Sequence, residues 1–287
     1  MTDLLQVDDL TITFPTPTGP TAVVRELSFT LPAGGSLGIV GESGSGKSMT
    51  SLAIMDLLPA SASRAGSVRL DGTELTTLSA GAMRRVRGDR IAMIFQDPLS
   101  SLNPYYTVGL QIAEAYRAHR PGVSRKQAKR VAIESMDRVK IPHAAGRVDD
   151  YPHQFSGGMR QRVMIAMALC TEPELLIADE PTTALDVTVQ AQILDLIREV
   201  RHDSGAGLIM ITHDLAVVAE IADQVLVMQH GRMVESGPAA RLFSDPQDPY
   251  TQALLEAVPR IDDEIADLRE VSGPQSGGLQ SQSGVDR

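Results

Sequence analysis

The sequence predicts an α/β fold with a mostly parallel sheet, an N-terminal antiparallel β subdomain and an inserted helical subdomain. Residues 175–178 and 208–212 are fully apolar runs, which is typical of parallel strands buried on both faces. Apolar side chains at helical spacing over residues 189–200 lie between these runs, so strands and helices alternate. Residues 106–150 change to helical patterning with a basic excess, which predicts the insertion.

Two antiparallel strands are predicted near the N-terminus. Apolar and polar side chains alternate in residues 10–14 and again in residues 23–31, and three prolines and a glycine between them predict a turn. Residues 66–75 add a strand with a turn at Asp71-Gly72. Residues 91–95 form a short apolar run of the buried-strand type.

Residues 41–48 read G-E-S-G-S-G-K-S and match the G-x-x-x-x-G-K-[ST] pattern of a phosphate-binding loop. An apolar run over residues 36–40 precedes the loop and helical spacing over residues 49–58 follows it, as a P-loop NTPase core requires. The backbone N–H groups of the loop and of the new helix would surround the phosphates of a nucleoside triphosphate. The predicted nucleotide-binding residues here are Gly41, Glu42, Ser43, Gly44, Ser45, Gly46, Lys47, Ser48 and Met49.

Phe14 closes the first predicted strand, ahead of the phosphate loop. Aromatic residues make up only 3% of the chain. This position favours a flat face on which the adenine ring stacks, and an ordinary core phenylalanine is the alternative.

Four polar residues follow predicted buried strands: Gln96, Asp179, Glu180 and His213. Sites in open α/β sheets lie at the carboxyl ends of the strands, so these side chains should meet beside the phosphate loop. Phosphoryl transfer to water needs a held triphosphate, Mg²⁺, an aligned water and neutralised charge. We assign Lys47 and His213 to the terminal phosphates and Glu180 to the water as general base. The predicted metal residues are Ser48, Gln96 and Asp179, and Gln96 also contacts the water.

Ser156, Gly157 and Gly158 open a predicted apolar helix over residues 159–169, with Ser156 as its N-cap. Glycines at a helix start permit close approach of a phosphate. Cys170 follows this helix among apolar neighbours and is predicted to be buried. A single cysteine forms neither an internal disulfide nor a thiolate metal cage, which favours a reducing compartment.

The net charge of −10 and the pI of about 5.1 argue against a general nucleic-acid binder. The basic excess in residues 106–150 could form a local nucleic-acid face, but a solvated helix surface is the simpler interpretation. No run reaches the roughly 18 apolar residues of a membrane span. We therefore expect no membrane span in this chain and no nucleic-acid partner.

These motifs resemble those of the nucleotide-binding subunits of ATP-binding cassette (ABC) transporters, over residues 1 to about 259. The matching parts are the Walker A loop at residues 41–48, the Q-loop at Gln96, the signature at residues 156–158, the Walker B strand at residues 175–180, the D-loop at residues 184–186 and the switch histidine at His213. Residues 95–104, 183–190 and 248–251 resemble the oligopeptide and dipeptide permease branch, which has nickel and glutathione relatives.

The resemblance implies that ATP and Mg²⁺ bind at the Walker A loop of one subunit while the signature of a second ABC subunit completes the site. It adds Ser156, Gly157, Gly158 and Asp186 to the ATP-binding residues. It implies transmembrane permease subunits as partners, an extracytoplasmic solute-binding protein acting through them, and a place on the cytoplasmic face of the membrane. Hydrolysis would drive import of di- or oligopeptides, with nickel, glutathione or another small solute as the alternative.

Soluble cassette ATPases acting on DNA or ribosomes share these motifs but usually carry long coiled coils, zinc cysteines or tandem cassettes, which this sequence does not show. A non-hydrolysing nucleotide sensor is disfavoured because Glu180 and His213 are both present. Peptide-branch members commonly continue into a cysteine-bearing tail, linked in some to an iron–sulfur cluster. Residues 272–287 contain no cysteine, so we expect no cluster.

The predicted domain organisation has four parts. Residues 1–105 and 164–240 form the ABC nucleotide-binding core, and residues 106–163 form the helical subdomain with the signature. Residues 241–271 form a C-terminal extension, in which a helix is expected over residues 250–257. Residues 272–287 are rich in Gly, Ser and Gln and are predicted to be disordered.

Overall fold

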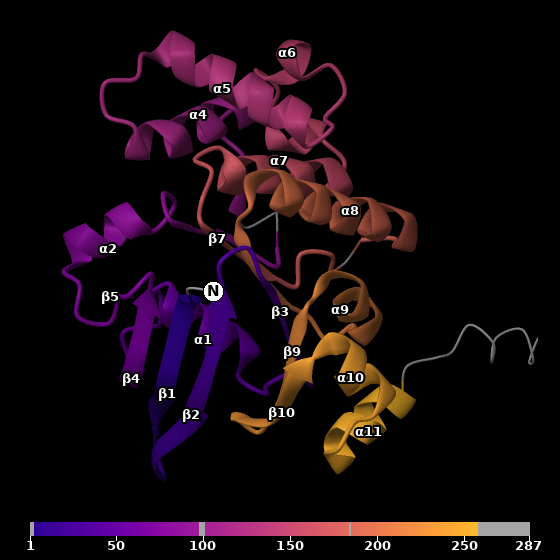
Figure 1. Cartoon of the computed structure of the whole chain (residues 1–287). Helices are drawn as coiled ribbons and strands as arrows, with labels where there is room; N and C mark the ends of the chain where they lie inside the picture. Colours follow the sequence, from indigo (N-terminus) through magenta and orange to yellow (C-terminus); the bar gives the residue numbers. More distant parts are fainter. Residues whose placement is uncertain (1–2, 98–100, 184, 258–287) are drawn as a thin grey trace, which may run out of the picture.

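Two β-sheets organise the chain in the computed structural model, which describes residues 3–97, 101–183 and 185–257. The first sheet has four strands in the order β2-β1-β4-β5, and the second has six strands in the order β10-β9-β3-β8-β7-β6. Figure 1 shows the antiparallel sheet at the lower left, the helices α4 to α7 at the top and the C-terminal helices at the lower right. The predicted fold class is confirmed.

The four-stranded sheet contains the predicted N-terminal hairpin, and its strands are β1 (Asp3–Thr16), β2 (Gly19–Pro32), β4 (Ser63–Leu70) and β5 (Thr73–Glu74). Strands β1 and β2 pair antiparallel, and each is longer than the alternating stretch that predicted it. The register shifts between Val7 and Leu10, where Asp9 has a φ of 49°. This irregularity interrupts the period of two, which is why the sequence pattern showed only the second half of β1.

The six-stranded sheet holds the strands predicted to be buried, and its members are β3 (Ser36–Val40), β6 (Ile91–Ile94), β7 (Leu175–Asp179), β8 (Gly207–Ile211), β9 (Gln224–Gln229) and β10 (Arg232–Pro238). Strands β3, β6, β7 and β8 are buried at every residue and pair in parallel, as predicted. Strand β10 pairs antiparallel with β9 at one edge. This β9–β10 hairpin was not predicted from the sequence.

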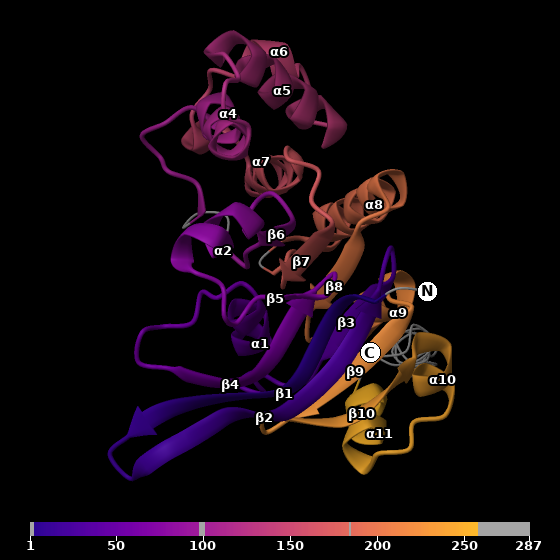
Figure 2. The same ribbon diagram turned by 60° about the vertical axis from the view of Figure 1, so that its left-hand side comes forward.

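Helices cover this sheet and form the insertion above it (Figures 1 and 2). Their bounds are α1 (Lys47–Ile54), α2 (Ala80–Val86), α4 (Val108–His119), α5 (Arg125–Arg138), α6 (Ala144–Arg147), the 3₁₀ helix η1 (Pro152–Gln154), α7 (Gly157–Leu169), α8 (Val187–Ser204), α9 (Leu215–Ile221), α10 (Ala239–Ser244) and α11 (Pro249–Glu256). The predicted helices over residues 159–169, 189–200 and 250–257 are confirmed as α7, α8 and α11. Ser156 caps α7 as predicted, since its side chain accepts a hydrogen bond from Met159 N.

The insertion shares a hydrophobic core with the six-stranded sheet. Ile112 on α4 and Ile165 on α7 belong to the same buried cluster as Ile94 at the end of β6. Helix α7 continues through the predicted subdomain boundary at residue 163, so one helix belongs to both predicted parts. The predicted disordered tail, residues 272–287, lies outside the described residues.

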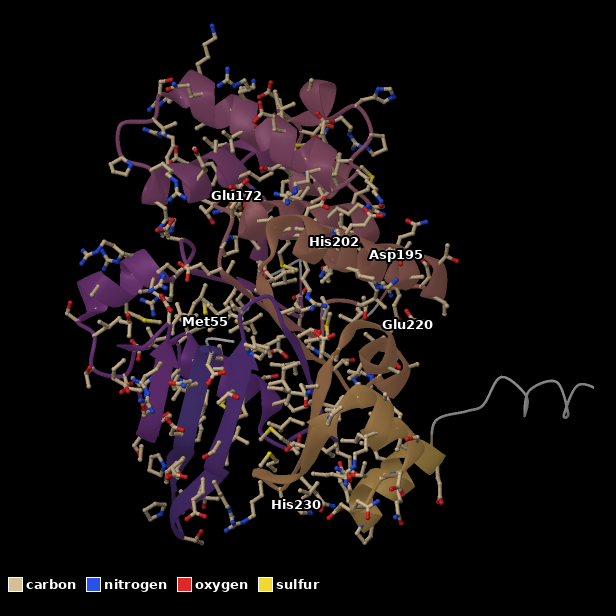
Figure 3. All side chains as sticks on the ribbon, in the orientation of Figure 1. Met55, Glu172, Asp195, His202, Glu220 and His230 are labelled. Carbon is tan, nitrogen blue, oxygen red and sulfur yellow. The ribbon has the colours of Figure 1, made fainter. Side chains whose placement is uncertain are left out.

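Helices α8 and α9 lie side by side, and Arg198 on α8 connects them through its ion pair with Glu220 on α9. Arg198 also pairs with Asp195 on its own helix, and Figure 3 labels both Asp195 and Glu220. Cys170 is buried, as predicted, and burial raises the pKa of its thiol to about 12. None of the helices within residues 3–97, 101–183 and 185–257 is long and apolar enough to cross a membrane.

Candidate functional site

The phosphate loop begins where β3 ends and finishes where α1 begins. Gly41 has a φ of 145°, and a Cβ atom there would lie 2.1 Å from the backbone oxygen of Met228 on β9. Only glycine fits this conformation and this close contact. Gly46 is the N-cap of α1, so the unpaired N–H groups of the first helical turn face the loop.

Lys47 lies inside the loop and is only 5% exposed. Its ammonium nitrogen donates hydrogen bonds to the backbone oxygens of Gly41, at 2.7 Å, and Glu42, at 2.8 Å. Burial lowers the pKa of Lys47, while the carboxylates of Glu180 and Asp179 oppose this shift. The loop therefore holds a buried cation at the position where a phosphate chain would add negative charge.

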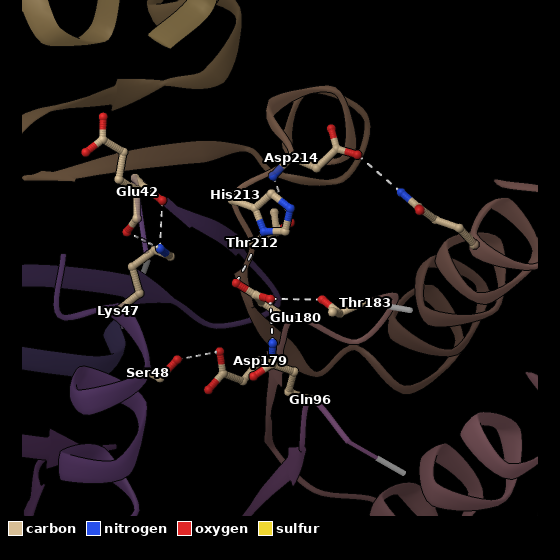
Figure 4. Close-up of polar contacts among 12 residues, drawn as sticks. Glu42, Lys47, Ser48, Gln96, Asp179, Glu180, Thr183, Thr212, His213 and Asp214 are labelled. Carbon is tan, nitrogen blue, oxygen red and sulfur yellow. Dashed lines mark hydrogen bonds and ion pairs between the residues drawn. The ribbon is translucent and has the colours of Figure 1, made fainter. Parts of the chain in front are cut away.

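Ser48 and Asp179 meet beside the loop, where Ser48 Oγ donates a hydrogen bond of 3.0 Å to Asp179 Oδ1 (Figure 4). Burial raises the pKa of Asp179, the hydrogen bond from Ser48 opposes this, and the Glu180 carboxylate adds to it. A hydroxyl and a carboxylate are the hard oxygen ligands that Mg²⁺ prefers. These two side chains fit a magnesium ion held at the phosphates.

Glu180 is the centre of a polar cluster at the ends of β6, β7 and β8. Its Oε2 accepts hydrogen bonds from Gln96 Nε2 at 2.8 Å and from Thr183 Oγ1 at 2.9 Å. Its Oε1 lies 3.3 Å from Nδ1 of His213 (Figure 4). Two predicted residues that follow other strands, Gln96 and His213, therefore converge on the Glu180 carboxylate, as the parallel sheet required.

A cavity of about 710 Å³ joins the loop to this cluster. The residues that line it are Phe14, Val23, Ser43, Gly44, Gly46, Lys47, Ser48, Met49, Gln96, Glu180 and His213. Its volume lies in the range of small-molecule sites, and Phe14 lines it from β1. Ser45 Oγ is buried in the loop without a hydrogen-bond partner among the described residues, which is a polar atom that a bound phosphate would satisfy. The cavity fits a nucleotide with its phosphates on the loop.

Residues 24–183 match the family model described as "ABC transporter". This range covers more than half of the chain. The chain belongs to the ABC transporter family. Residues 234–284 of this ABC chain also match the model described as "Oligopeptide/dipeptide transporter, C-terminal region".

Two relatives of this ABC chain carry the name oligopeptide transport ATP-binding protein OppD. The Salmonella typhimurium (strain LT2) protein is 52% identical over 94% of this chain and 80% of its own length. The Haemophilus influenzae protein is 50% identical over 95% of this chain and 84% of its own length. Among solved structures, the dimeric cassette MJ0796 bound to ADP and Pi has a TM-score of 0.73 at 24% identity, and the match covers 82% of this chain and 98% of that one.

The predicted residues of the signature and the D-loop do not line the nucleotide cavity of their own chain. Ser156 caps α7, and Asp186 caps α8 by accepting a hydrogen bond from Val189 N. A Cβ atom on Gly158 would lie 2.5 Å from Val189 Cγ1, so Gly158 permits close packing of α7 on α8. Gly157 has open space around it. The signature is thus an exposed helix start that does not line the cavity at the phosphate loop of its own chain.

Three residues of the site were not predicted from the sequence, and the first is Val23, which lines the cavity from β2. Thr183 contacts Glu180 directly and follows it by only three residues, so its proximity was the available signal. Tyr250 contacts the phosphate loop from α11, where its hydroxyl accepts a hydrogen bond from Glu42 N. No local sequence pattern relates two residues so far apart in the chain. Its detection required the tertiary fold.

Proposed function

We propose that this chain is the ATP-binding and ATP-hydrolysing subunit of an importer for di- or oligopeptides. The observation that carries the peptide assignment is the match of residues 234–284 to the oligopeptide/dipeptide C-terminal region, together with the 52% identity to an OppD protein. The ATPase assignment is supported by the Glu180 cluster, which places a carboxylate beside the phosphate loop. Glu180, Gln96, His213 and Lys47 are the proposed catalytic residues.

The proposed tasks are divided among these side chains. The Lys47 ammonium would exchange its two carbonyl partners for phosphate oxygens, while Ser48 and Asp179, with Gln96, would hold the metal ion. Bound Mg²⁺ supplies positive charge that neutralises the phosphate oxygens. Glu180 would accept the proton of the attacking water, and Gln96 and His213, both within hydrogen-bond distance of Glu180, would orient that water and the γ-phosphate.

The second half of each site would come from another cassette. The signature residues do not line the cavity at the phosphate loop of the same chain, and the MJ0796 cassette of similar fold is a dimer. Ser156, Gly157, Gly158 and Asp186 would therefore complete the site of the opposite subunit. Closure of such a dimer on two ATP molecules and its reopening after hydrolysis would drive transport.

An apolar groove offers a surface for the permease. The groove has a volume of about 530 Å³ and lies between the core and the insertion, with Met55, Phe95, Ala115, Met164 and Met167 among its lining residues. Phe95, which precedes the Q-loop residue Gln96, is 40% exposed. A cytoplasmic segment of a permease subunit docked here would connect the membrane to the γ-phosphate side of the site and hold the chain at the cytoplasmic face.

The assignment is tested by substrate-dependent ATP hydrolysis. The chain, assembled with its permease and solute-binding protein in membrane vesicles, is expected to release phosphate faster when short peptides are present. Nickel or glutathione serve as matched alternative solutes. Stimulation by either of these, without stimulation by peptides, would contradict the peptide assignment while keeping the importer.

Phe14→Ala is expected to weaken nucleotide binding by about tenfold, since stacking of a base on an aromatic ring contributes about 1–3 kcal/mol. The maximal rate should change little, because stacking acts equally before and during the reaction. Titration with ATP measures the effect. Phe29→Ala is the matched control, because Phe29 packs against the same core as Phe14 but does not line the nucleotide cavity. An unchanged affinity in Phe14→Ala would leave Phe14 a core residue only.

A further inference from the structure

The phosphate loop has a contact with the C-terminal helix α11 that the proposed reaction does not use. The backbone N–H of Glu42, the second residue of the loop, donates a hydrogen bond of 3.0 Å to the hydroxyl of Tyr250. Tyr250 stands 208 positions further along the chain, in the first turn of α11. Helix α11 therefore contacts the phosphate loop directly.

Tyr250 is held in place by its surroundings. Asp248 caps α11 by accepting a 2.8 Å hydrogen bond from Tyr250 N, and Pro249 occupies the first turn. Glu235 on β10 accepts hydrogen bonds from Gln247 N at 2.9 Å and Asp248 N at 3.1 Å. The start of α11 is thus fixed to β10, and so to the sheet that carries the loop.

The extension also packs against the strand that leads into the loop. Val40, the last residue of β3, belongs to a buried cluster against which Tyr250, Leu254 and Leu255 pack. The ring of Tyr250 therefore contributes apolar contacts, and its hydroxyl contributes one polar contact. Burial raises the pKa of Tyr250, so the hydroxyl stays neutral and protonated.

The backbone oxygen of Glu42 makes two hydrogen bonds within the loop. The Glu42 backbone oxygen accepts hydrogen bonds from Lys47 Nζ at 2.8 Å and from Ser45 N at 3.2 Å. Tyr250 fixes the N–H of the same residue. The position of the Lys47 ammonium is therefore linked to α11 through one residue.

We propose that Tyr250 is a positioning residue that holds the phosphate loop in its nucleotide-binding conformation, and that the C-terminal extension thereby tunes nucleotide affinity. The proposal rests on the proposed ATPase function. A loop that is already ordered loses less conformational freedom when the nucleotide binds, so removal of the hydroxyl weakens binding. Because Tyr250 does not line the nucleotide cavity, its effect is transmitted through Glu42.

Tyr250→Phe tests this inference because it removes the hydroxyl and retains the ring that packs near Val40. Titration of the full chain with ATP and Mg²⁺ is expected to show affinity reduced about three- to tenfold, the size of one net hydrogen bond. Hydrogen exchange of the loop amides, residues 41–48, should be faster in the nucleotide-free variant. The midpoint of thermal unfolding should stay close to that of the wild type.

Tyr116→Phe is the matched control. It makes the same chemical change in a half-buried tyrosine on α4, far along the chain from the loop, and should leave affinity unchanged. Unchanged affinity or unchanged loop exchange in Tyr250→Phe would overturn the positioning role and would show that Tyr250 only stabilises the fold. A wild-type chain that binds no nucleotide would overturn the proposed function as well, so the two failures are distinguishable.

Discussion

Glu180→Gln is expected to bind ATP as tightly as the wild type but to hydrolyse it at least about 100-fold more slowly, the usual loss for a missing general base. The amide has nearly the shape of the carboxylate, and its oxygen can still accept hydrogen bonds from Gln96 and Thr183. It cannot accept the proton of the attacking water. ATP should therefore stay bound and trap the cassette dimer in its closed form.

Phosphate release and ATP titration, measured on the same preparation, check this expectation. Glu220→Gln is the matched control, because Glu220 lies on the surface of α9 and pairs with Arg198. That variant should retain wild-type turnover. Near-normal turnover in Glu180→Gln would place the general base on another residue.

The sequence predicted the buried parts of the fold well because burial leaves a periodic pattern. Strands β3, β7 and β8 are covered on both faces and read as apolar runs, and α8 buries one face. The hairpin of β9 and β10 was missed although Val225 to Met228 is an apolar run. Its partner β10 is a mostly exposed edge strand without alternation, so the pair lacked the usual hairpin pattern.

The site was predictable where its residues directly follow strands. Parallel strands end at one edge of the sheet, so Gln96, Glu180 and His213 had to converge once the strands were assigned. The contact between Tyr250 and Glu42 could not be predicted in this way. It depends on how α11 docks on β10, and that docking depends on tertiary packing rather than on local spacing.

The mixture of two inactive variants is expected to be active if one nucleotide site needs two chains. Lys47→Ala removes the buried cation from the phosphate loop of its own chain. Ser156→Arg places a bulky cation at the exposed signature, where it would enter the phosphate site of the partner. In a mixed dimer both defects fall in the same site. The other site then keeps an intact Lys47 and an intact Ser156.

Random pairing would make about half of the dimers mixed, so activity could recover to about a quarter of the wild-type level if one site can turn over alone. Each variant alone should be inactive. If the chain pairs with a different cassette, the two substitutions are divided between the two subunits. Lys47→Ala is then made in this chain, and the signature substitution is made in its partner.

Phosphate release by the mixed dimers tests most directly whether the loop and the signature of one chain serve different sites. Recovery of activity on mixing two inactive preparations is the result that the shared site predicts. Persistent inactivity of dimers whose formation has been verified, in both arrangements, would contradict it and would indicate that each site is complete within one chain.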